Sequence, residues 1–258
     1  MIYSFKSDKF ENTDWLSHFF FSRLGGVSAG EYASLNCSLG RETDIPNVKE
    51  NHKIVAEKIG IPVEKLLFVN QIHSTVAVKV TELWDNDKRP DADAMVTNKP
   101  NIALAVITAD CVPVLFADKQ AKIIGAAHSG WKGTLEGVLE STVNAMKELG
   151  ADPANIEAVI GPCIAFSSYE VQEDFRAEFI AKDKDSEKFF IPSPRKGRWL
   201  CNLPGYVSFR LKRAGVKIVY DIEQDTVVNE KFFFSNRRAF MRSQKSYGLQ
   251  PSVIMIKE

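Results

Sequence analysis

Three almost uninterrupted apolar runs lie close together in the middle of the chain. They cover residues 102–108, 112–116 and 122–127, and only short polar connections separate them. Runs of this length are typical of β-strands buried on both faces, whereas a strand with one wet face alternates apolar and polar residues. A sheet that is covered on both sides needs further layers, so the runs favour a layered α/β fold.

Helices and further strands are predicted around these runs. The clearest helix covers residues 134–149, between a Thr that can cap it and a Gly that can end it. Other helices are predicted at residues 44–60, 175–180 and 204–214, and other strands at 17–22, 66–69, 75–80, 156–160 and 216–220. Two prolines indicate a loop at 191–198. The alternation of strands and helices predicts one mixed α/β domain over residues 1–258.

The charge balance excludes several classes of protein. The 258 residues include 33 Lys and Arg and 33 Asp and Glu, so the formal net charge is zero. Proteins that coat nucleic acids or bind membrane surfaces through basic residues carry a basic excess. We therefore expect no nucleic-acid partner and no membrane partner; the oligomeric state stays open. The four cysteines form no close pair and residues 1–6 start no apolar leader, so we expect a cytoplasmic protein with reduced thiols.

Two histidines and one cysteine stand at the ends of predicted strands. His73 follows the strand at 66–69, Cys111 lies between two apolar runs, and His128 directly follows the third run. Two imidazoles and one thiolate suit zinc and leave a fourth position for a water molecule, which the metal would activate. The three residues are far apart in the sequence, so their spacing alone is weak support for a metal site.

Other interpretations of these three residues remain open. Cys111 and a histidine would also suit a thiol hydrolase that needs no metal. Cys111 could equally be a small buried thiol, and His73 an exposed residue in a turn. His52 lies among charged residues of the predicted helix at 44–60, so we expect it at the surface.

A glycine-rich loop offers the first candidate for an anion site. Arg23 and the backbone amides of Gly25 and Gly26 are a suitable donor set for a phosphate, and Lys132 is the second candidate. Plain solvent exposure of the two basic side chains explains the pattern equally well. The same loop would serve as an interface if the chain were a binding module without catalytic activity.

Two residues beside the predicted ligands could assist catalysis. Asp110 precedes Cys111 and could move protons, although neighbouring side chains on an extended segment often point to opposite faces. It could instead orient a ligand or cap a backbone segment. Trp131 could stack on a base or simply cover the end of a strand.

Six short motifs resemble the YfiH-like family, which is also described as the polyphenol oxidase or "laccase" family and as purine nucleoside phosphorylase/adenosine deaminase. They lie in family order at residues 21–36, 70–73, 91–97, 108–113, 127–133 and 160–164. The resemblance implies a single-domain, mixed-sheet α/β sandwich of the cysteine-hydrolase-like kind. Six co-linear motifs make it specific, whereas any one alone would not be.

The resemblance also implies a site and an activity. It assigns His73, Cys111 and His128 as zinc ligands, with copper as the alternative metal, and adds Asn36 and Gln71 as substrate-binding candidates. The implied substrates are small nucleosides with phosphate. The implied reactions are phosphorolysis of adenosine, inosine, guanosine and methylthioadenosine, and hydrolytic deamination of adenosine. An alternative role in bacterial members is editing of peptidoglycan precursors, which would suit an amide hydrolase.

Two further observations limit what the resemblance implies. The chain departs from the family pattern at Asn202, Asp225 and Leu249, so its C-terminal third is expected to form a different pocket wall. A four-copper laccase needs many histidines, and this chain has four in total, with no His-x-His pair. We therefore expect one metal ion at most.

Overall fold

The three apolar runs form long buried strands that lie in two different sheets. β6 (Ala103–Thr108) belongs to one sheet, whereas β7 (Val112–Asp118) and β8 (Ile123–Ser129) pair antiparallel in the other. The computed structural model describes residues 1–11, 14–40 and 45–258. Nearly every residue of the three strands is buried, which confirms the expected burial on both faces.

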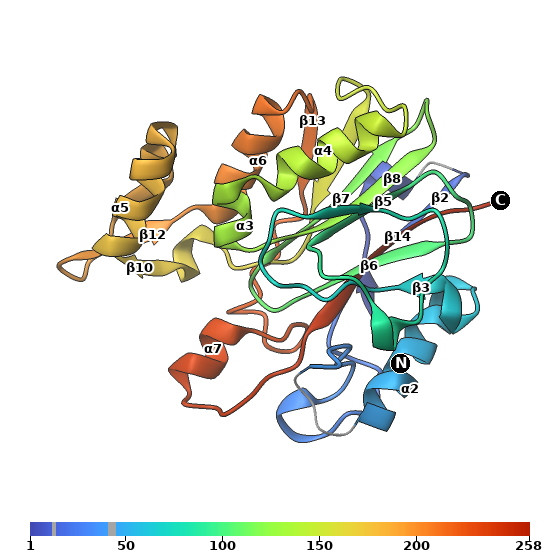
Figure 1. Ribbon diagram of the computed structural model, residues 1–258. Helices are drawn as coiled ribbons and strands as arrows, with labels where there is room; N and C mark the ends of the chain where they lie inside the picture. The colour runs from blue at the N-terminus through green and yellow to red at the C-terminus, as the bar shows by residue number, and fades with distance from the viewer. Residues whose placement is uncertain (12–13, 41–44) are drawn as a thin grey trace.

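The strands of the described residues form two large sheets and one small sheet (Figure 1). The six-stranded sheet has the order β13-β9-β7-β8-β5-β4 and adds β4 (Ala77–Lys79), β5 (Ala94–Thr97), β9 (Ile156–Ile160) and β13 (Ile218–Asp221). The five-stranded sheet has the order β1-β2-β14-β6-β3 and adds β1 (Ser4–Phe5), β2 (Leu16–Phe21), β3 (Leu66–Leu67) and β14 (Gln250–Ile256). The small sheet contains β10 (Glu170–Gln172), β12 (Arg198–Cys201) and β11 (Phe190–Pro192).

Apolar side chains from both large sheets meet in a central core. Phe20 and Ile254 of the five-stranded sheet share one buried cluster with Met95 and Leu115 of the six-stranded sheet. The two sheets therefore lie face to face, as in a sandwich. Burying each of these side chains contributes about 1.5–3 kcal/mol, which favours this one alignment of the sheets.

Helices cover the outer face of each large sheet. In Figure 1, α4 (Val138–Glu148) and α6 (Leu203–Arg213) lie above the sheets and α2 (Ile45–Ile59) lies below them. Leu139 of α4 and Val207 of α6 are buried against the six-stranded sheet, and Val55 of α2 against the five-stranded sheet. The result is the α/β sandwich that the sequence predicts, with a helical layer on each side.

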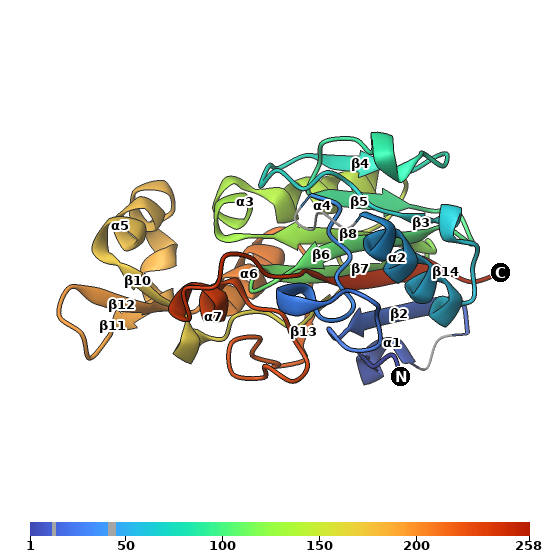
Figure 2. The same cartoon turned by 90° about the horizontal axis from the view of Figure 1, so that it is seen from below.

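Smaller elements surround the sandwich. They are α1 (Asp8–Glu11), α3 (Trp131–Glu136), α5 (Glu173–Lys182) and α7 (Asn236–Met241). α5 and the three-stranded sheet project together from one side of the sandwich in both views (Figure 1, Figure 2). Within the described residues, no helix is long and apolar enough to cross a membrane.

Two predicted segments differ from the observed ones. The helix predicted at 134–149 is two helices, α3 and α4, because Gly137 between them has a left-handed backbone with φ 112°. The predicted loop at 191–198 contains the end of β11 and the start of β12, because both pair antiparallel across it. The first residue of the predicted helix at 44–60 lies outside the described residues.

The prediction that His52 lies at the surface is wrong. Its side chain is only 4% exposed and stacks on Phe68, with ring centroids 4.3 Å apart. One ring nitrogen lies 2.9 Å from the carbonyl oxygen of Cys37. Burial lowers the pKa of His52 to about 4, so the ring is neutral. Val48, His52 and Val55 share the buried face of α2, and this spacing explains the burial.

Candidate metal centre

Three adjacent strands of the six-stranded sheet, β7, β8 and β5, bring a cysteine, a histidine and an aspartate together at the same end of these strands. Cys111 directly precedes β7, and His128 lies opposite Pro113 near the end of β8. β5 pairs with the other side of β8, which places Asp93 beside His128. The backbone N–H of His128 donates to the Asp93 carbonyl oxygen at 2.7 Å. The strand register therefore fixes the relative positions of all three side chains.

The loop between β3 and β4 brings His73 to the same end of these strands. Its backbone is left-handed, with φ 59°, which is uncommon for a residue other than glycine. Its N–H donates to the Asp93 carboxylate at 3.1 Å. Asp110, which precedes Cys111, is also left-handed, with φ 83°. Two unusual backbone conformations thus flank the same small region of the protein.

The ligand atoms of the predicted zinc residues come together. Those of His73, Cys111 and His128 all lie within 4.8 Å of one another, and Cys111 Sγ is 4.0 Å from His73 Nε2. Tetrahedral zinc with bonds of about 2.0–2.3 Å holds its ligand atoms about 3.3–3.8 Å apart. The donor set therefore fits one metal ion after small side-chain movements. It is the one such His/Cys/Asp/Glu group in the part of the chain that the structure describes.

Asp93 organises this cluster, although it does not belong to the predicted ligands. Its carboxylate is fully buried and lies 2.7 Å from His128 Nδ1. It also accepts hydrogen bonds from the backbone N–H groups of Ile72, His73 and Ser74 and from the Ser74 hydroxyl. A metal-binding histidine commonly donates its second ring N–H to a carboxylate in this way. One carboxylate therefore orients His128 and holds the loop that carries His73.

Cys111 and His128 shift each other's pKa in opposite directions. Burial raises the pKa of the Cys111 thiol, but the charge of His128 and its hydrogen bond outweigh burial and lower that pKa to about 6. Burial lowers the pKa of His128, but Cys111 and Asp93 outweigh it and raise that pKa to about 9. The metal-free pair is therefore a thiolate beside an imidazolium at neutral pH. Metal binding has to displace the imidazolium proton.

Gly130 leaves room for the cluster. A Cβ atom on this residue would lie 2.9 Å from His73 Cδ2 and 3.3 Å from both Cys111 Sγ and His73 Nε2. Carbon atoms at optimal contact are about 3.5–4.0 Å apart, so the methyl group of an alanine would push the ligands aside. Glycine is therefore required by the close approach of the ligands.

Two cavities meet at the centre. The walls of the larger, about 400 Å³, include Gln71, Arg89 and Leu249. The walls of the smaller, about 240 Å³, include Trp131, Tyr169 and Arg237. His73 and Cys111 line both cavities, so a small molecule in either one would reach the ligand atoms.

Asp110 points toward the C-terminal segment. Its carboxylate accepts hydrogen bonds from the hydroxyls of Thr226 (2.6 Å) and Ser235 (3.0 Å) and from the backbone N–H of Arg237 (2.6 Å). Burial raises its pKa, although these donors and Arg238 act in the opposite direction. These contacts match the capping role considered for Asp110. Its part in catalysis stays a prediction.

The glycine-rich loop uses its donors internally. The amides of Gly25 and Gly26 both donate to Ser34 Oγ, at 3.0 and 3.1 Å. Arg23 donates from Nε to the Ala33 carbonyl oxygen, and its guanidinium lies 4.4 Å from the Phe234 ring centroid. None of these three residues lines either cavity at the metal centre. A phosphate site at this loop stays a prediction.

Of the other predicted substrate residues, Gln71 lines the larger cavity and Asn36 lines neither cavity at the centre. Gln71 pairs with the backbone of Ile107 through both its amide oxygen and its amide nitrogen, at 2.8 Å each. Asn36 is buried and accepts hydrogen bonds from Ser38 and Leu249. These contacts fix the wall of the larger cavity.

The two neighbouring candidates on α3 differ from each other. Trp131 lines the smaller cavity, and its ring packs on Phe175 with centroids 5.0 Å apart. Lys132 is exposed and lines neither cavity at the centre. Trp131 is thus the candidate of this pair that could contact a ligand there.

The three departures from the family pattern have structural roles. Asn202 accepts a hydrogen bond from the Gly205 N–H at the start of α6, so it caps this helix as an aspartate would. Asp225 accepts a hydrogen bond from the Ser168 hydroxyl at 2.5 Å. Leu249 lines the larger cavity, which agrees with a changed pocket wall.

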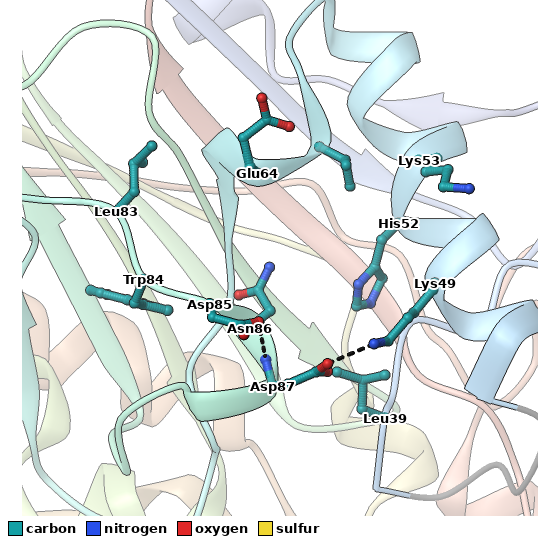
Figure 3. Close-up of a pocket in the computed structure, with 11 residues that line it drawn as sticks. Leu39, Lys49, His52, Lys53, Glu64, Leu83, Trp84, Asp85, Asn86 and Asp87 are labelled. Atoms are coloured by element: carbon teal, nitrogen blue, oxygen red, sulfur yellow. Dashed lines mark hydrogen bonds and ion pairs between the residues drawn. The ribbon is translucent and has the colours of Figure 1, made fainter.

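Another cavity, of about 500 Å³, lies against α2 (Figure 3). Lys49 and Asp87 point toward each other there and form an ion pair of 2.6 Å, and the rings of His52 and Trp84 also line it. It shares no lining residue with the metal centre. Although larger, it holds no group of His, Cys, Asp or Glu spaced for a metal among the described residues.

Residues 17–257, which include the whole metal centre, match a family model described as multi-copper polyphenol oxidoreductase laccase. The chain belongs to this family. A purine nucleoside phosphorylase of Rickettsia conorii is 39% identical over 220 residues, which are 85% of this chain and 88% of the relative. Purine nucleoside phosphorylase YfiH of Escherichia coli is 35% identical over 217 residues, or 84% and 86%.

Solved structures in the family have the same fold. Neisseria meningitidis protein NMB0706, of family DUF152, has a TM-score of 0.85 and 31% identity and covers 100% of this chain and 99% of its own. YfiH of Bacillus licheniformis has a TM-score of 0.86 and 30% identity, with coverage of 94% and 93%. The family membership and the sandwich fold expected from the six motifs are both confirmed.

Proposed function

We propose that the chain is a zinc-dependent purine nucleoside phosphorylase whose metal ligands are His73, Cys111 and His128. The carrying observation is that these three donors converge in the wall of the larger cavity, with Asp93 behind them. The relatives named purine nucleoside phosphorylase supply the reaction class. Bound zinc would act as a Lewis acid and would activate water for the second reaction, deamination of adenosine.

The residues of the chain have separate tasks in this proposal. Asp93 keeps the Nδ1 proton on His128, so Nε2 faces the metal position. The cavity walls hold the nucleoside and exclude bulk water. In phosphorolysis, a phosphate oxygen forms a bond to the ribose C1′ atom as the bond from C1′ to the base nitrogen breaks. The base leaves with the electron pair and takes up a proton.

A four-copper oxidase mechanism does not fit this chain despite the family description. His18 accepts a hydrogen bond from the Ser7 N–H through Nε2, and His52 is bonded to the Cys37 carbonyl oxygen. Only His73 and His128 are left for a metal, and a trinuclear copper cluster with its mononuclear partner needs many more imidazoles. The donor count therefore favours a single metal ion.

Metal analysis combined with a phosphate-dependent inosine assay tests the proposal. We expect one zinc per chain, release of the free base only with phosphate, and loss of both metal and turnover in His73→Ala and Cys111→Ala. Cys201→Ala removes a buried thiol outside the centre and serves as the control, with metal and turnover kept. Full turnover in metal-free Cys111→Ala would refute the proposal.

A metal-free amide hydrolase, such as one that edits peptidoglycan precursors, is the second candidate. The observation that favours it is the Cys111–His128–Asp93 arrangement, in which the thiol has a pKa of about 6. A thiolate beside an imidazolium held by a carboxylate is the usual arrangement of a cysteine nucleophile. Activity that survives a chelator and is lost on alkylation of Cys111 would favour this candidate over the zinc enzyme.

A further inference from the structure

Two arginines line the cavities at the metal centre. Arg89 lies in the wall of the larger cavity, and Arg237 in the wall of the smaller one. Among the described residues, neither guanidinium lies within ion-pair distance of a carboxylate. An arginine without a neutralising acid at the edge of a cavity is suited to bind an anion there.

Arg237 is held in place by uncharged contacts. Its Nη1 donates to the backbone carbonyl oxygen of Glu170 at 2.8 Å, and its guanidinium lies 5.4 Å from the Tyr169 ring centroid. Its own backbone N–H donates to the Asp110 carboxylate. These contacts orient the side chain and leave its charge unmatched. Because the side chain is already ordered, it loses less conformational entropy when an anion binds.

The two acidic residues that Arg237 contacts, Glu170 and Asp110, have carboxylates that are engaged with other donors. The carboxylate of Glu170 accepts a hydrogen bond from the Ser193 hydroxyl at 2.6 Å and lies 3.3 Å from Arg195. The Asp110 carboxylate is occupied by two hydroxyls and a backbone N–H. Both acids are therefore satisfied without the guanidinium of Arg237.

Arg89 lies in the wall of the larger cavity, away from Arg237. Its Nη1 donates to the backbone carbonyl oxygen of Asn86 at 2.9 Å. The negative charge of Asp87 acts on it, although burial lowers its pKa overall. Asp87 itself belongs to the other cavity, the one against α2. Asp87 is itself paired with Lys49, and Arg89 Nε is buried without a hydrogen-bond partner, so Arg89 is the anion candidate of the larger cavity and Arg237 that of the smaller one.

We propose that Arg237 binds the inorganic phosphate that attacks the nucleoside, in the cavity that it shares with His73 and Cys111. This cavity of about 240 Å³ has room for about eight water molecules of about 30 Å³ each, so a phosphate fits beside the ribose end of a substrate. An outer cavity of about 600 Å³ shares Arg237, Tyr169 and Trp131 with it, and the wall of this outer cavity also carries Arg198 and the acids Glu170, Asp174 and Glu178. This inference rests on the proposed phosphorolysis.

Calorimetric titration of the full-length protein with inorganic phosphate, with and without bound zinc, tests the proposal. Losing charged hydrogen bonds to phosphate should raise the Kd about 10- to 100-fold in Arg237→Gln. Arg237→Lys keeps the charge without the planar fork and should fall between this variant and the wild type. Arg195→Gln is the matched control, because it removes an arginine that also contacts Glu170 but is exposed and lines no cavity at the centre.

Kinetics separate the subsite from a purely structural role. With inosine, the KM for phosphate should rise in Arg237→Gln while the KM for inosine and the zinc content stay at wild-type values. An unchanged phosphate Kd in Arg237→Gln, in a protein that keeps its zinc and its melting temperature, would overturn the proposal. If the melting temperature of Arg237→Gln is below that of the wild type, Arg237→Lys is used instead. An unchanged phosphate Kd and phosphate KM in Arg237→Lys would overturn the proposal equally.

The outcomes also distinguish this inference from the proposed function. Suppose that phosphate binding depends on Arg237 but the wild-type protein turns over no nucleoside. This result would refute phosphorolysis and keep the anion site. Phosphorolysis at a normal rate with unchanged phosphate KM in both Arg237 variants would keep the function and overturn the subsite.

Discussion

Replacing Asp93 by Asn removes one negative charge from the side of the metal centre and keeps the shape of the side chain. The carboxylate now serves His128, His73, Ile72 and Ser74 through five hydrogen bonds. An amide keeps one accepting oxygen, while its NH₂ group can only donate. Whichever way it turns, the NH₂ group faces at least two donors that then have no acceptor.

The magnitude follows from the number of lost contacts. A hydrogen bond to a charged group contributes about 1.5–3 kcal/mol, so losing two of them lowers the free energy of unfolding by about 3–6 kcal/mol. Loss of the acceptor behind His128 should weaken zinc binding about 10- to 100-fold, as is usual for a residue that holds a metal ligand. Ser74→Ala removes a single hydroxyl donor to the Asp93 carboxylate and should cost about 1.5–3 kcal/mol, the magnitude of one such bond.

Urea unfolding and zinc competition with a chromophoric chelator measure both effects. Asp91→Asn is the matched control: it lies two residues away on the same segment, is exposed, and accepts a hydrogen bond from the Asn70 side chain. We expect its stability and zinc affinity to be close to those of the wild type. The reasoning is wrong if Asp93→Asn binds zinc as tightly as the wild type or is no less stable than Asp91→Asn.

Two further predictions concern the ligands themselves. Gly130→Ala should weaken zinc binding about 10-fold or more, because its methyl group overlaps His73; an unchanged Kd in the chelator competition would contradict the steric reason. In the metal-free protein, the rate at which iodoacetamide alkylates Cys111 should fall to half of its high-pH value near pH 6. The reason is that the thiolate is the reactive form and the lowered pKa of Cys111 is about 6. His128→Ala removes the main cause of the lowered Cys111 pKa. The midpoint of the alkylation rate against pH, followed by mass spectrometry, should therefore move up toward the ordinary thiol value of 9.0.

The sequence points to the three candidate metal ligands more readily than to the residues that support them. His73, Cys111 and His128 each stand at the end of an apolar segment, and this position could be recognised without knowing how the strands pair. The role of Asp93 depends on β5 pairing with β8, which is a contact between segments far apart in the chain. The available signal was its place in the motif at 91–97, directly before an apolar segment.

The helices show the same difference between local and long-range information. The helix at 204–214 is predictable because its cap Asn202, its proline and its apolar face are close together in the sequence. The break at Gly137 was not, because a glycine inside a helical pattern is usually tolerated and only packing decides its backbone conformation. The charged neighbours of His52 favour an exposed position, whereas its spacing from Val48 and Val55 places it on the apolar face.

The metal centre and its cavity walls come from different parts of the chain. The cluster and its support lie between residues 73 and 130, on strands held by the sandwich core. Arg237 and Leu249 in the walls belong to the C-terminal segment, which Asp110 ties to the cluster through side-chain contacts. Substitutions in that segment can accumulate without moving the metal ligands. A change in that segment would therefore reshape the space around the candidate metal centre before it displaced the strands that carry Cys111 and His128.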